Sequence, residues 1–199
     1  MTKPYSASCE RNWRPIADIL KKLVHNKPQT LFEVGSGTGQ HAIYITPHFQ
    51  KLTWIASDIL SNHDSIKEWL SEAKEANIKG PIEYEVGKND FPYKQYDIVF
   101  TANSFHIMSW KSVQQLIKSS SKRLGNKALF VVYGPFKYGG AYTSQSNADF
   151  DQWLYQRDSN STIRNFEDVQ HHMKTHGLSL LNDFKMPANN QILVFQKDS

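Results

Sequence analysis

The chain has 199 residues, of which 39% are hydrophobic and 21% charged, a composition that suits one folded domain and leaves little room for two. No run approaches the roughly 20 apolar residues of a membrane span, and the amino terminus lacks the apolar segment of a signal peptide, so no membrane partner is expected. The net charge of +4 is dispersed and gives no strong signal for nucleic acid. Because Cys9 is the single cysteine, no intrachain disulfide can form, and we expect a cytoplasmic protein with one domain over residues 1–199.

Helix and strand patterns alternate along the first half of the chain. Apolar residues at helical spacing predict a first helix, which together with the polar segment before it (residues 1–25) is a candidate lid over a ligand site. Pro47 is expected to interrupt or strain the second helix. In chain order the predicted elements are helix 11–24, strand 30–34, helix 39–49, strand 52–57, helix 64–76 and strand 82–86.

The second half continues the alternation. The run 129–132 is apolar at every position, as in parallel strands that are covered on both faces. An aromatic and glycine-rich segment, 136–142, is too long for a simple turn and predicts a pocket wall or lid. The other predicted elements are strand 96–103, a helix that carries Trp110 to Leu124, strand 128–133, helices 148–157 and 166–176, and strands 178–184 and 191–195. This pattern predicts an α/β fold with a doubly wound, Rossmann-like sheet and helices on both faces.

A glycine-rich loop follows the first strand. Glycines at alternate positions permit positive φ and let a ligand lie directly on the backbone, while the next helix offers free N–H groups. The fingerprint of nicotinamide cofactors is G-x-G-x-x-G, whereas here the third glycine comes one residue earlier, which disfavours an oxidoreductase. The loop resembles motif I of class I S-adenosylmethionine-dependent methyltransferases, where it holds the methionine and ribose parts of the cofactor. Its candidate cofactor-binding residues are Glu33, Gly35, Ser36, Gly37, Thr38 and Gly39.

Further candidate cofactor residues stand at the ends of other strands. In a doubly wound sheet, ligands bind beyond the carboxyl ends of the strands, where the strand order reverses, and Asn103 ends a strand that borders this point. Asp58 ends the second strand, where a carboxylate can accept hydrogen bonds from both ribose hydroxyls, although a helix-capping or loop aspartate is the alternative. By resemblance to class I methyltransferases, Glu85 and the backbone N–H of Val86 are expected at the adenine. Asp90 is the second choice, and a solvated loop acid is the alternative for both carboxylates.

Several short segments carry a resemblance to a known family: Ser8–Asn12, Gly35–His41, Leu52–Trp54, Ser57-Asp58, Phe105–Ile107 with Trp110, Tyr133–Phe136, Ser146-Asn147, Phe150-Asp151, Arg157-Asp158, Ile163-Arg164 and Met186–Asn190. Together they cover nearly the whole chain and resemble the methyltransferase-like 26 proteins, also known as the DUF938 group of class I methyltransferase-like proteins. This chain departs from them at Gly35, where alanine is common, and at Phe91, where tryptophan is usual. The resemblance implies a mostly parallel seven-stranded sheet with an antiparallel last strand, and S-adenosylmethionine as cofactor, but no particular substrate.

Candidate groups for chemistry gather after the fourth predicted strand. His106 is a candidate general base, and the alternative is a histidine that bonds to backbone and shapes the cofactor pocket. Several aromatic residues are candidates to wall an acceptor, or equally to pack in the core: Phe105, Trp110, Tyr133, Phe136, Tyr138 and Tyr142. His172 and His176 have the spacing of a metal-binding pair, but no acidic motif accompanies them, so we expect a solvated helix face and no metal site.

These observations favour an S-adenosylmethionine-dependent methyltransferase that acts on a small-molecule acceptor by in-line displacement. The alternative is a catalytically silent S-adenosylmethionine-binding interaction protein with a methyltransferase fold. The segment Ser8–Asn12 shows no obvious core role and is expected to fold over the mouth of the cofactor or acceptor site. Deleting residues 1–12 is then expected to weaken cofactor binding without unfolding the domain.

Overall fold

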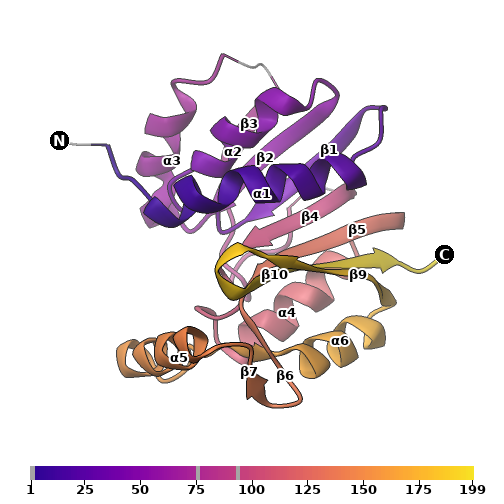
Figure 1. Cartoon of the computed structure of the whole chain (residues 1–199). Coiled ribbons are helices and arrows are strands. Elements are labelled where there is room, and N and C mark those ends of the chain that lie inside the picture. Colours follow the sequence, from indigo (N-terminus) through magenta and orange to yellow (C-terminus); the bar gives the residue numbers. More distant parts are fainter. Residues whose placement is uncertain (1–2, 75–76, 93–94) are drawn as a thin grey trace.

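A computed structural model describes residues 3–74, 77–92 and 95–199, and its centre is a seven-stranded sheet with helices on both faces (Figure 1). The strand order is β3-β2-β1-β4-β5-β10-β9. The last strand, β10, runs antiparallel to both of its neighbours, while the pairs among β1 to β5 are parallel. The predicted Rossmann-like sheet with an antiparallel last strand is confirmed.

The first half of the chain differs from the prediction at several element ends. The first helix begins at Ala7, four residues earlier than predicted, and the second helix ends at Ile45 rather than at residue 49. The third strand lies earlier than predicted, because Gly80 and Pro81 interrupt the strand pattern of the sequence, whereas an edge strand tolerates both residues. The helix predicted over 64–76 ends at Leu70, and residues 75 and 76 lie outside the described part of the chain. The elements are α1 (Ala7–Leu23), β1 (Gln29–Val34), α2 (Gln40–Ile45), β2 (Leu52–Asp58), α3 (His63–Leu70) and β3 (Ile78–Glu83), with short 3₁₀ turns at Thr46–His48 and Leu60–Asn62.

The second half of the chain completes the sheet and adds a small second one. The segment predicted as a pocket wall or lid forms the hairpin of β6 and β7, which joins β8 in a three-stranded sheet. The elements are β4 (Tyr96–Ala102), α4 (Trp110–Ser121), β5 (Leu124–Gly134), β6 (Phe136–Tyr138), β7 (Ala141–Tyr142), α5 (Gln145–Arg157), β8 (Arg164–Asn165), α6 (Phe166–Thr175), β9 (Leu178–Met186), a 3₁₀ turn at Pro187–Asn189 and β10 (Asn190–Lys197).

Two apolar layers hold the helices on the sheet. On one face α1 and α2 pack through buried residues such as Leu20 and Ile45, and on the other α4 and α6 pack through residues such as Leu116 and Val169 (Figure 1). Because both faces of the central strands are covered, the strands are apolar at nearly every position. Because β1, β2 and β4 run parallel, their carboxyl ends lie at one edge of the sheet, where the loops that follow them meet.

The amino-terminal segment is docked on the residues that follow the glycine loop. The backbone N–H of Ser6 donates to Oε1 of Gln40 at 2.5 Å, and Nε2 of Gln40 donates back to the Ser6 carbonyl at 3.4 Å. One residue later, Nε2 of His41 donates to Oδ1 of Asn12 at 2.8 Å, and its Nδ1 lies 4.0 Å from Sγ of Cys9. Both Cys9 and Asn12 are buried. The expectation that Ser8–Asn12 has no core role is therefore wrong, because these side chains complete the partners of a buried histidine.

Beneath the loop, Glu33 carries a carboxylate with no exposed surface. Its Oε2 accepts hydrogen bonds from Oγ of Ser36 at 2.8 Å and Nε1 of Trp54 at 2.9 Å, and its Oε1 lies 3.4 Å from Nδ1 of His41. Burial by itself lowers the pKa of an imidazole, but the Cys9 thiol and the Glu33 carboxylate outweigh burial and raise the pKa of His41 to about 10. At neutral pH the charge on Glu33 is thus balanced by an imidazolium, as a buried carboxylate requires.

Replacing His41 by glutamine removes this imidazolium, and we expect the free energy of unfolding at pH 7 to fall by about 3 kcal/mol or more. The folded-state pKa of His41, about 10, exceeds the unfolded value of about 6.5. The stability that protonation of His41 contributes is therefore complete below the unfolded pKa and is lost as pH rises through about 10. Urea denaturation of wild type and His41→Gln between pH 7 and pH 10 measures this contribution as a difference that shrinks with pH.

The exposed His25 provides a control, since His25→Gln removes an imidazole without disturbing Glu33. A difference between wild type and His41→Gln that stays constant across the pH range would contradict the assigned charge state.

Candidate functional site

The three glycines of the loop after β1 all have left-handed backbone, with φ of +74° at Gly35, +60° at Gly37 and +88° at Gly39. A Cβ at Gly35 would lie 2.8 Å from Oγ of Ser104, and one at Gly39 would lie 3.3 Å from Ile66. A Cβ at Gly37 would meet no atom within 4 Å. The first and third glycines are therefore needed for packing as well as for backbone conformation, while Gly37 presents bare backbone to open space.

The other predicted cofactor residues of this loop lie beneath it or at its end. Glu33 directs its oxygens to protein donors, and Ser36, also buried, accepts a hydrogen bond from the N–H of Ser57 at 3.1 Å. Oγ1 of Thr38 donates to Oε1 of Gln40 at 2.9 Å. Glu33 and Ser36 thus support the loop from below, and Gly37 forms the part of it that faces outward.

Asp58 ends β2 beside the loop, where the prediction placed it. Its Oδ2 accepts a hydrogen bond from the N–H of Gly37 at 2.7 Å, and its Oδ1 accepts from the N–H of Ile59 at 2.7 Å and from Nδ2 of Asn62 at 2.9 Å. A carboxylate has about four lone-pair sites, so three donors leave room for a further one. The structure therefore brings Asp58 and Gly37 together at the edge of the sheet.

Glu85 and Val86 lie in the turn that follows β3, beyond the end of the strand as the structure has it. The carboxylate of Glu85 pairs with Nζ of Lys88 at 2.7 Å on the surface, and the N–H of Glu85 donates to Oδ1 of Asn89 at 2.8 Å. The second choice, Asp90, is exposed. This turn continues the same edge, since the N–H of Tyr84 donates to the carbonyl of Asp58 at 3.0 Å.

A cavity of about 400 Å³ opens on the other side of the loop, at the ends of β4 and β5. Asn103, which has a positive φ of 57°, contributes to it and donates its N–H to the carbonyl of Tyr133 at 2.9 Å. Burial raises the pKa of the Tyr133 hydroxyl, partly offset by the hydrogen bond from Asn12 and the charge of Arg11, so the hydroxyl is protonated at neutral pH. The lining residues are Ser8, Arg11, Asn12, Pro15, Asn103, Tyr133, Pro187, Ala188 and Asn190.

The aromatic residues predicted to wall an acceptor do not form one pocket. Tyr133 lines the cavity beside Asn103, whereas Phe105 and Phe136 are almost fully buried in the core. Trp110 packs against the edge of the core, 6.2 Å from the ring of His172. Tyr138 and Tyr142 line a separate cavity of about 390 Å³ between the β6–β7 hairpin and β9, where the Tyr138 hydroxyl donates to Asp183 at 2.7 Å.

His106 lies behind the end of β5 and is 5% exposed. Its ring meets that of Phe150 edge-on at 5.3 Å between centroids, and a Cβ built at Gly134 would lie 3.6 Å from its Nδ1. Burial, reinforced by the positive charge of Arg164 and opposed by Asp151, lowers the pKa of His106 to about 4. Its imidazole is therefore neutral at physiological pH and is a weaker base than a solvated histidine.

Arg164 holds the loop that carries His106, a role that the sequence analysis missed. Its Nε donates to the carbonyl of Phe105 at 3.0 Å, and its guanidinium also donates to the carbonyls of Met108 and Asn160. Because one side chain ties three carbonyls, the backbone on either side of His106 is held in place. The family-like segment Ile163-Arg164 marked this position without indicating what it does.

Asp151 is the second residue that the sequence analysis left without a role. Its oxygens accept hydrogen bonds from Oγ1 of Thr162 at 2.7 Å, the N–H of Ile163 at 2.6 Å and the hydroxyl of Tyr142 at 2.8 Å, and lie 3.3 Å from Nζ of Lys137. Burial by itself raises the pKa of this carboxyl, but these donors and the Lys137 charge outweigh it and hold the pKa below its usual range. Asp151 thus joins α5 to the hairpin and to the segment before β8.

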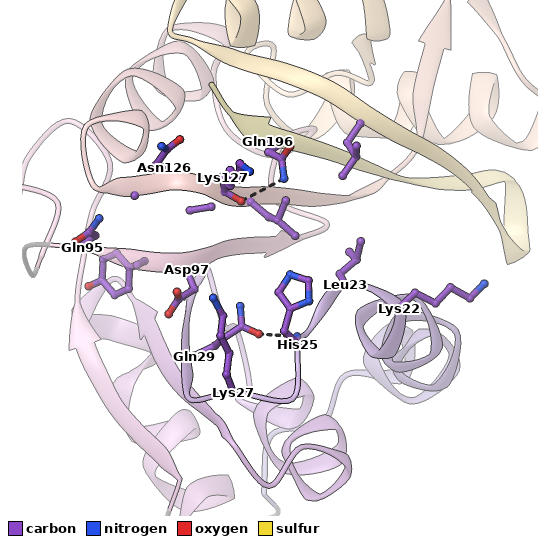
Figure 2. Close-up of a pocket in the computed structure, with 15 residues that line it drawn as sticks. Lys22, Leu23, His25, Lys27, Gln29, Gln95, Asp97, Asn126, Lys127 and Gln196 are labelled. Carbon is purple, nitrogen blue, oxygen red and sulfur yellow. Dashed lines mark hydrogen bonds between the residues drawn. The ribbon is translucent and has the colours of Figure 1, made fainter. Parts of the chain in front are cut away.

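Elsewhere in the described structure, a cavity of about 680 Å³ opens at the opposite edge of the sheet (Figure 2). It is lined by His25, Lys27 and Gln29 before and at the start of β1, and by Asp97 and Lys127 near the starts of β4 and β5. Ligands of doubly wound folds bind at the carboxyl ends of the strands, so this cavity is not the candidate site.

The part of the chain that the structure describes holds neither a metal-binding cluster nor a membrane-spanning helix. Among residues 3–74, 77–92 and 95–199, no three His, Cys, Asp or Glu side chains gather closely enough to hold a metal ion. The two histidines at metal-binding spacing instead face each other with ring centroids 4.7 Å apart, and Nε2 of His172 donates to the carbonyl of Gln114. No helix in this part of the chain is both long and apolar enough to cross a membrane.

Solved structures with this fold include several methyltransferases. An O-methyltransferase family protein from Burkholderia thailandensis has a TM-score of 0.82 at 13% identity, over 96% of this chain and 57% of that chain. An O-methyltransferase family 2 protein from Planctomyces limnophilus, in complex with apigenin, has a TM-score of 0.80 at 12% identity, over 96% and 60%. Human N-acetylserotonin methyltransferase in complex with S-adenosylmethionine has a TM-score of 0.80 at 13% identity, over 96% and 53%.

At such identities the likeness shows the fold, and this chain spans 53–60% of the length of these three proteins. A family model described as "Protein of unknown function (DUF938)" matches residues 3–197, which is nearly the whole chain. The chain therefore belongs to the DUF938 family and has the class I methyltransferase fold.

Proposed function

We propose that this protein binds S-adenosylmethionine at the glycine loop and transfers its methyl group to a small-molecule acceptor. The observation that carries the proposal is Gly37, whose backbone is left-handed, faces open space and lies 2.7 Å from a carboxylate oxygen of Asp58. Bare backbone beside a carboxylate at the ends of neighbouring parallel strands is the arrangement that suits an adenosine-containing ligand. The complex of the human structural neighbour with S-adenosylmethionine supports this choice of cofactor.

The residues at this edge fit the parts of such a cofactor. Gly35–Gly39, including Ser36 and Thr38, would lie against the methionine and ribose parts, with Glu33 supporting the loop from below. Asp58 would accept a hydrogen bond from a ribose hydroxyl at its remaining lone-pair site, while Glu85 and the backbone of Val86 would meet the adenine. When bound, this cofactor supplies a methyl group on a positively charged sulfur. An acceptor atom can bond to the methyl carbon in line with the carbon–sulfur bond, and the sulfur then leaves.

The protein's own part in such a transfer is to hold the acceptor close and aligned in a dry pocket. The cavity beside Asn103 and Tyr133 would take the acceptor, because it lies at the ends of β4 and β5 next to the loop and has the buried residues Asn12 and Tyr133 in its lining. Phe105, Trp110 and Phe136 would support its surroundings from the core, and the cavity at Tyr138 and Tyr142 would stand next to it. His106 would accept the proton of an acceptor hydroxyl, since its low pKa leaves the imidazole unprotonated at neutral pH.

Replacing Gly37 by aspartate places a side chain and a negative charge in the open space beside Asp58. We expect about a hundredfold or greater loss of affinity for S-adenosylhomocysteine in a calorimetric titration. The new carboxylate would stand in the space of the ligand, beside the like charge of Asp58, which repels it. Aspartate tolerates left-handed backbone better than most residues, so the fold should persist. Wild type should not bind NAD in the same experiment.

Gly140→Asp is the matched control, since Gly140 has φ of +78° and a Cβ there also meets nothing within 4 Å. Retained affinity of Gly37→Asp for S-adenosylhomocysteine would place the cofactor elsewhere.

A screen of hydroxyl and amine compounds for release of S-adenosylhomocysteine tests turnover. With an acceptor in hand, His106→Ala is expected to lower kcat about a hundredfold and to leave cofactor affinity unchanged. The wild-type rate should be constant above about pH 5 and fall as pH drops through the His106 pKa of about 4. His171→Ala, an exposed histidine on α6, is the control.

If His106→Ala keeps the kcat of the wild type, His106 takes no part in the reaction. Cofactor binding without turnover of any compound would favour the catalytically silent binding protein.

A further inference from the structure

The cavity beside Asn103 has one wall made by a single face of α1. Ser8, Arg11, Asn12 and Pro15 line it, and their spacing of three, four and seven residues puts them on the same side of the helix. Its volume of about 400 Å³ lies within the range of small-molecule sites. We refer to this space, with the lining residues given above, as the Arg11 cavity.

The Arg11 cavity has one charged lining residue. Its other polar side chains, which include Asn103, Tyr133 and Asn190, are neutral at pH 7. Among the described residues, no acidic side chain forms an ion pair with Arg11, and the hydrogen bonds found there do not include its guanidinium. The exposed guanidinium therefore retains its planar set of donors, which matches a carboxylate through two parallel hydrogen bonds.

The position of Arg11 is set by the fold. The neighbouring Asn12 is buried and bonded to His41, so this turn of α1 is anchored to the residues that follow the glycine loop. Arg11 and Tyr133 both line the cavity, so the two side chains face the same space. The helix backbone that carries Arg11 is therefore held in place beside the cavity.

The strand order separates the Arg11 cavity from the cofactor side of the site. The glycine loop and Asp58 follow β1 and β2, whereas the cavity lies over the ends of β4 and β5 and under the turn between β9 and β10. Asn103, at the end of β4, stands at the boundary. The cavity is thus placed for a second ligand beside the first.

We propose that the Arg11 cavity binds an organic acid and that Arg11 holds its carboxylate, so that the methyl acceptor of this protein is a small carboxylic acid. The apolar body of the acid lies against the ring of Tyr133 and the side chains of Pro15 and Pro187, and its far end points to Asn103. A single cation among neutral amides matches one negative charge, whereas a phosphate ester, with close to two, would lack a second cation. The statement that the bound acid is the methyl acceptor rests on the proposed function. Binding of the acid itself can be measured without turnover.

The test is calorimetric titration of the protein, with and without saturating S-adenosylhomocysteine, using two acids and their neutral amides as probes. The pairs are para-hydroxybenzoate with para-hydroxybenzamide, and lactate with lactamide. We expect wild type to bind at least one acid about tenfold or more tightly than its amide. Arg11→Gln should abolish this preference, and Arg11→Lys should keep part of it.

Arg14→Gln is the matched control, because Arg14 lies on the same helix, stands over the ring of Trp13 at 5.1 Å and does not line the cavity. It should behave as wild type. The affinity for S-adenosylhomocysteine should be the same in all four proteins.

Equal affinity for acids and amides, or a preference that survives Arg11→Gln, overturns the inference. Loss of S-adenosylhomocysteine affinity in Arg11→Gln also overturns it, since Arg11 would then hold the methionine carboxylate of the cofactor. Displacement of the acid by inorganic phosphate at equal concentration overturns the choice of a carboxylate. If wild type binds the acid through Arg11 but does not bind S-adenosylhomocysteine, the acid site stands and the proposed methyltransferase function fails.

Discussion

Glu33 keeps a charged carboxylate in the interior, and the glycine loop, β2 and α2 all contact it. Ser36 in the loop and Trp54 in β2 donate to one oxygen, and His41 at the start of α2 faces the other. A buried charge is tolerated only with such partners, so the loop, the second strand and the second helix must adopt these positions together. His41 extends the same network to Asn12 in α1. The conformation of the candidate cofactor loop and the docking of the amino-terminal helix are thus parts of one arrangement.

The opposite side of the candidate site depends on a second set of polar contacts. Arg164 binds three carbonyls in and near the loop after β4, and Asp151 binds the segment that precedes β8. Between these two sets lies the edge of the sheet where β4 and β5 end, with Asn103 and Tyr133. A methyl transfer needs little chemistry from the protein and much positioning, so rigid supports on both sides suit the proposed function.

The alternation of helix and strand patterns along the chain was sufficient to predict the sheet. Parallel strands that are covered on both faces appear in the sequence as continuous apolar runs, such as that of β5. The same patterns placed β3 too late in the chain. Gly80 and Pro81 interrupt the apolar pattern of the sequence, but they do not interrupt a strand at the edge of a sheet. The role of the Ser8–Asn12 segment was missed for a different reason. A polar side chain such as Asn12 is buried only because His41, distant in the chain, offers it a hydrogen bond, and no local pattern carries that information.

By itself, the sequence determined the fold class and the place of the glycine loop, because both depend on local requirements: apolar periodicity in the strands, and residues that accept left-handed backbone in the loop. Only the tertiary structure decided which glycine faces open space, which aromatic residues pack in the core, and that Arg11 has no acidic partner among the described residues where it stands over the ends of β4 and β5. These properties depend on which side chains approach from distant parts of the chain. Burial, charge pairing and access are properties of such neighbours, and they exist only once the chain has folded.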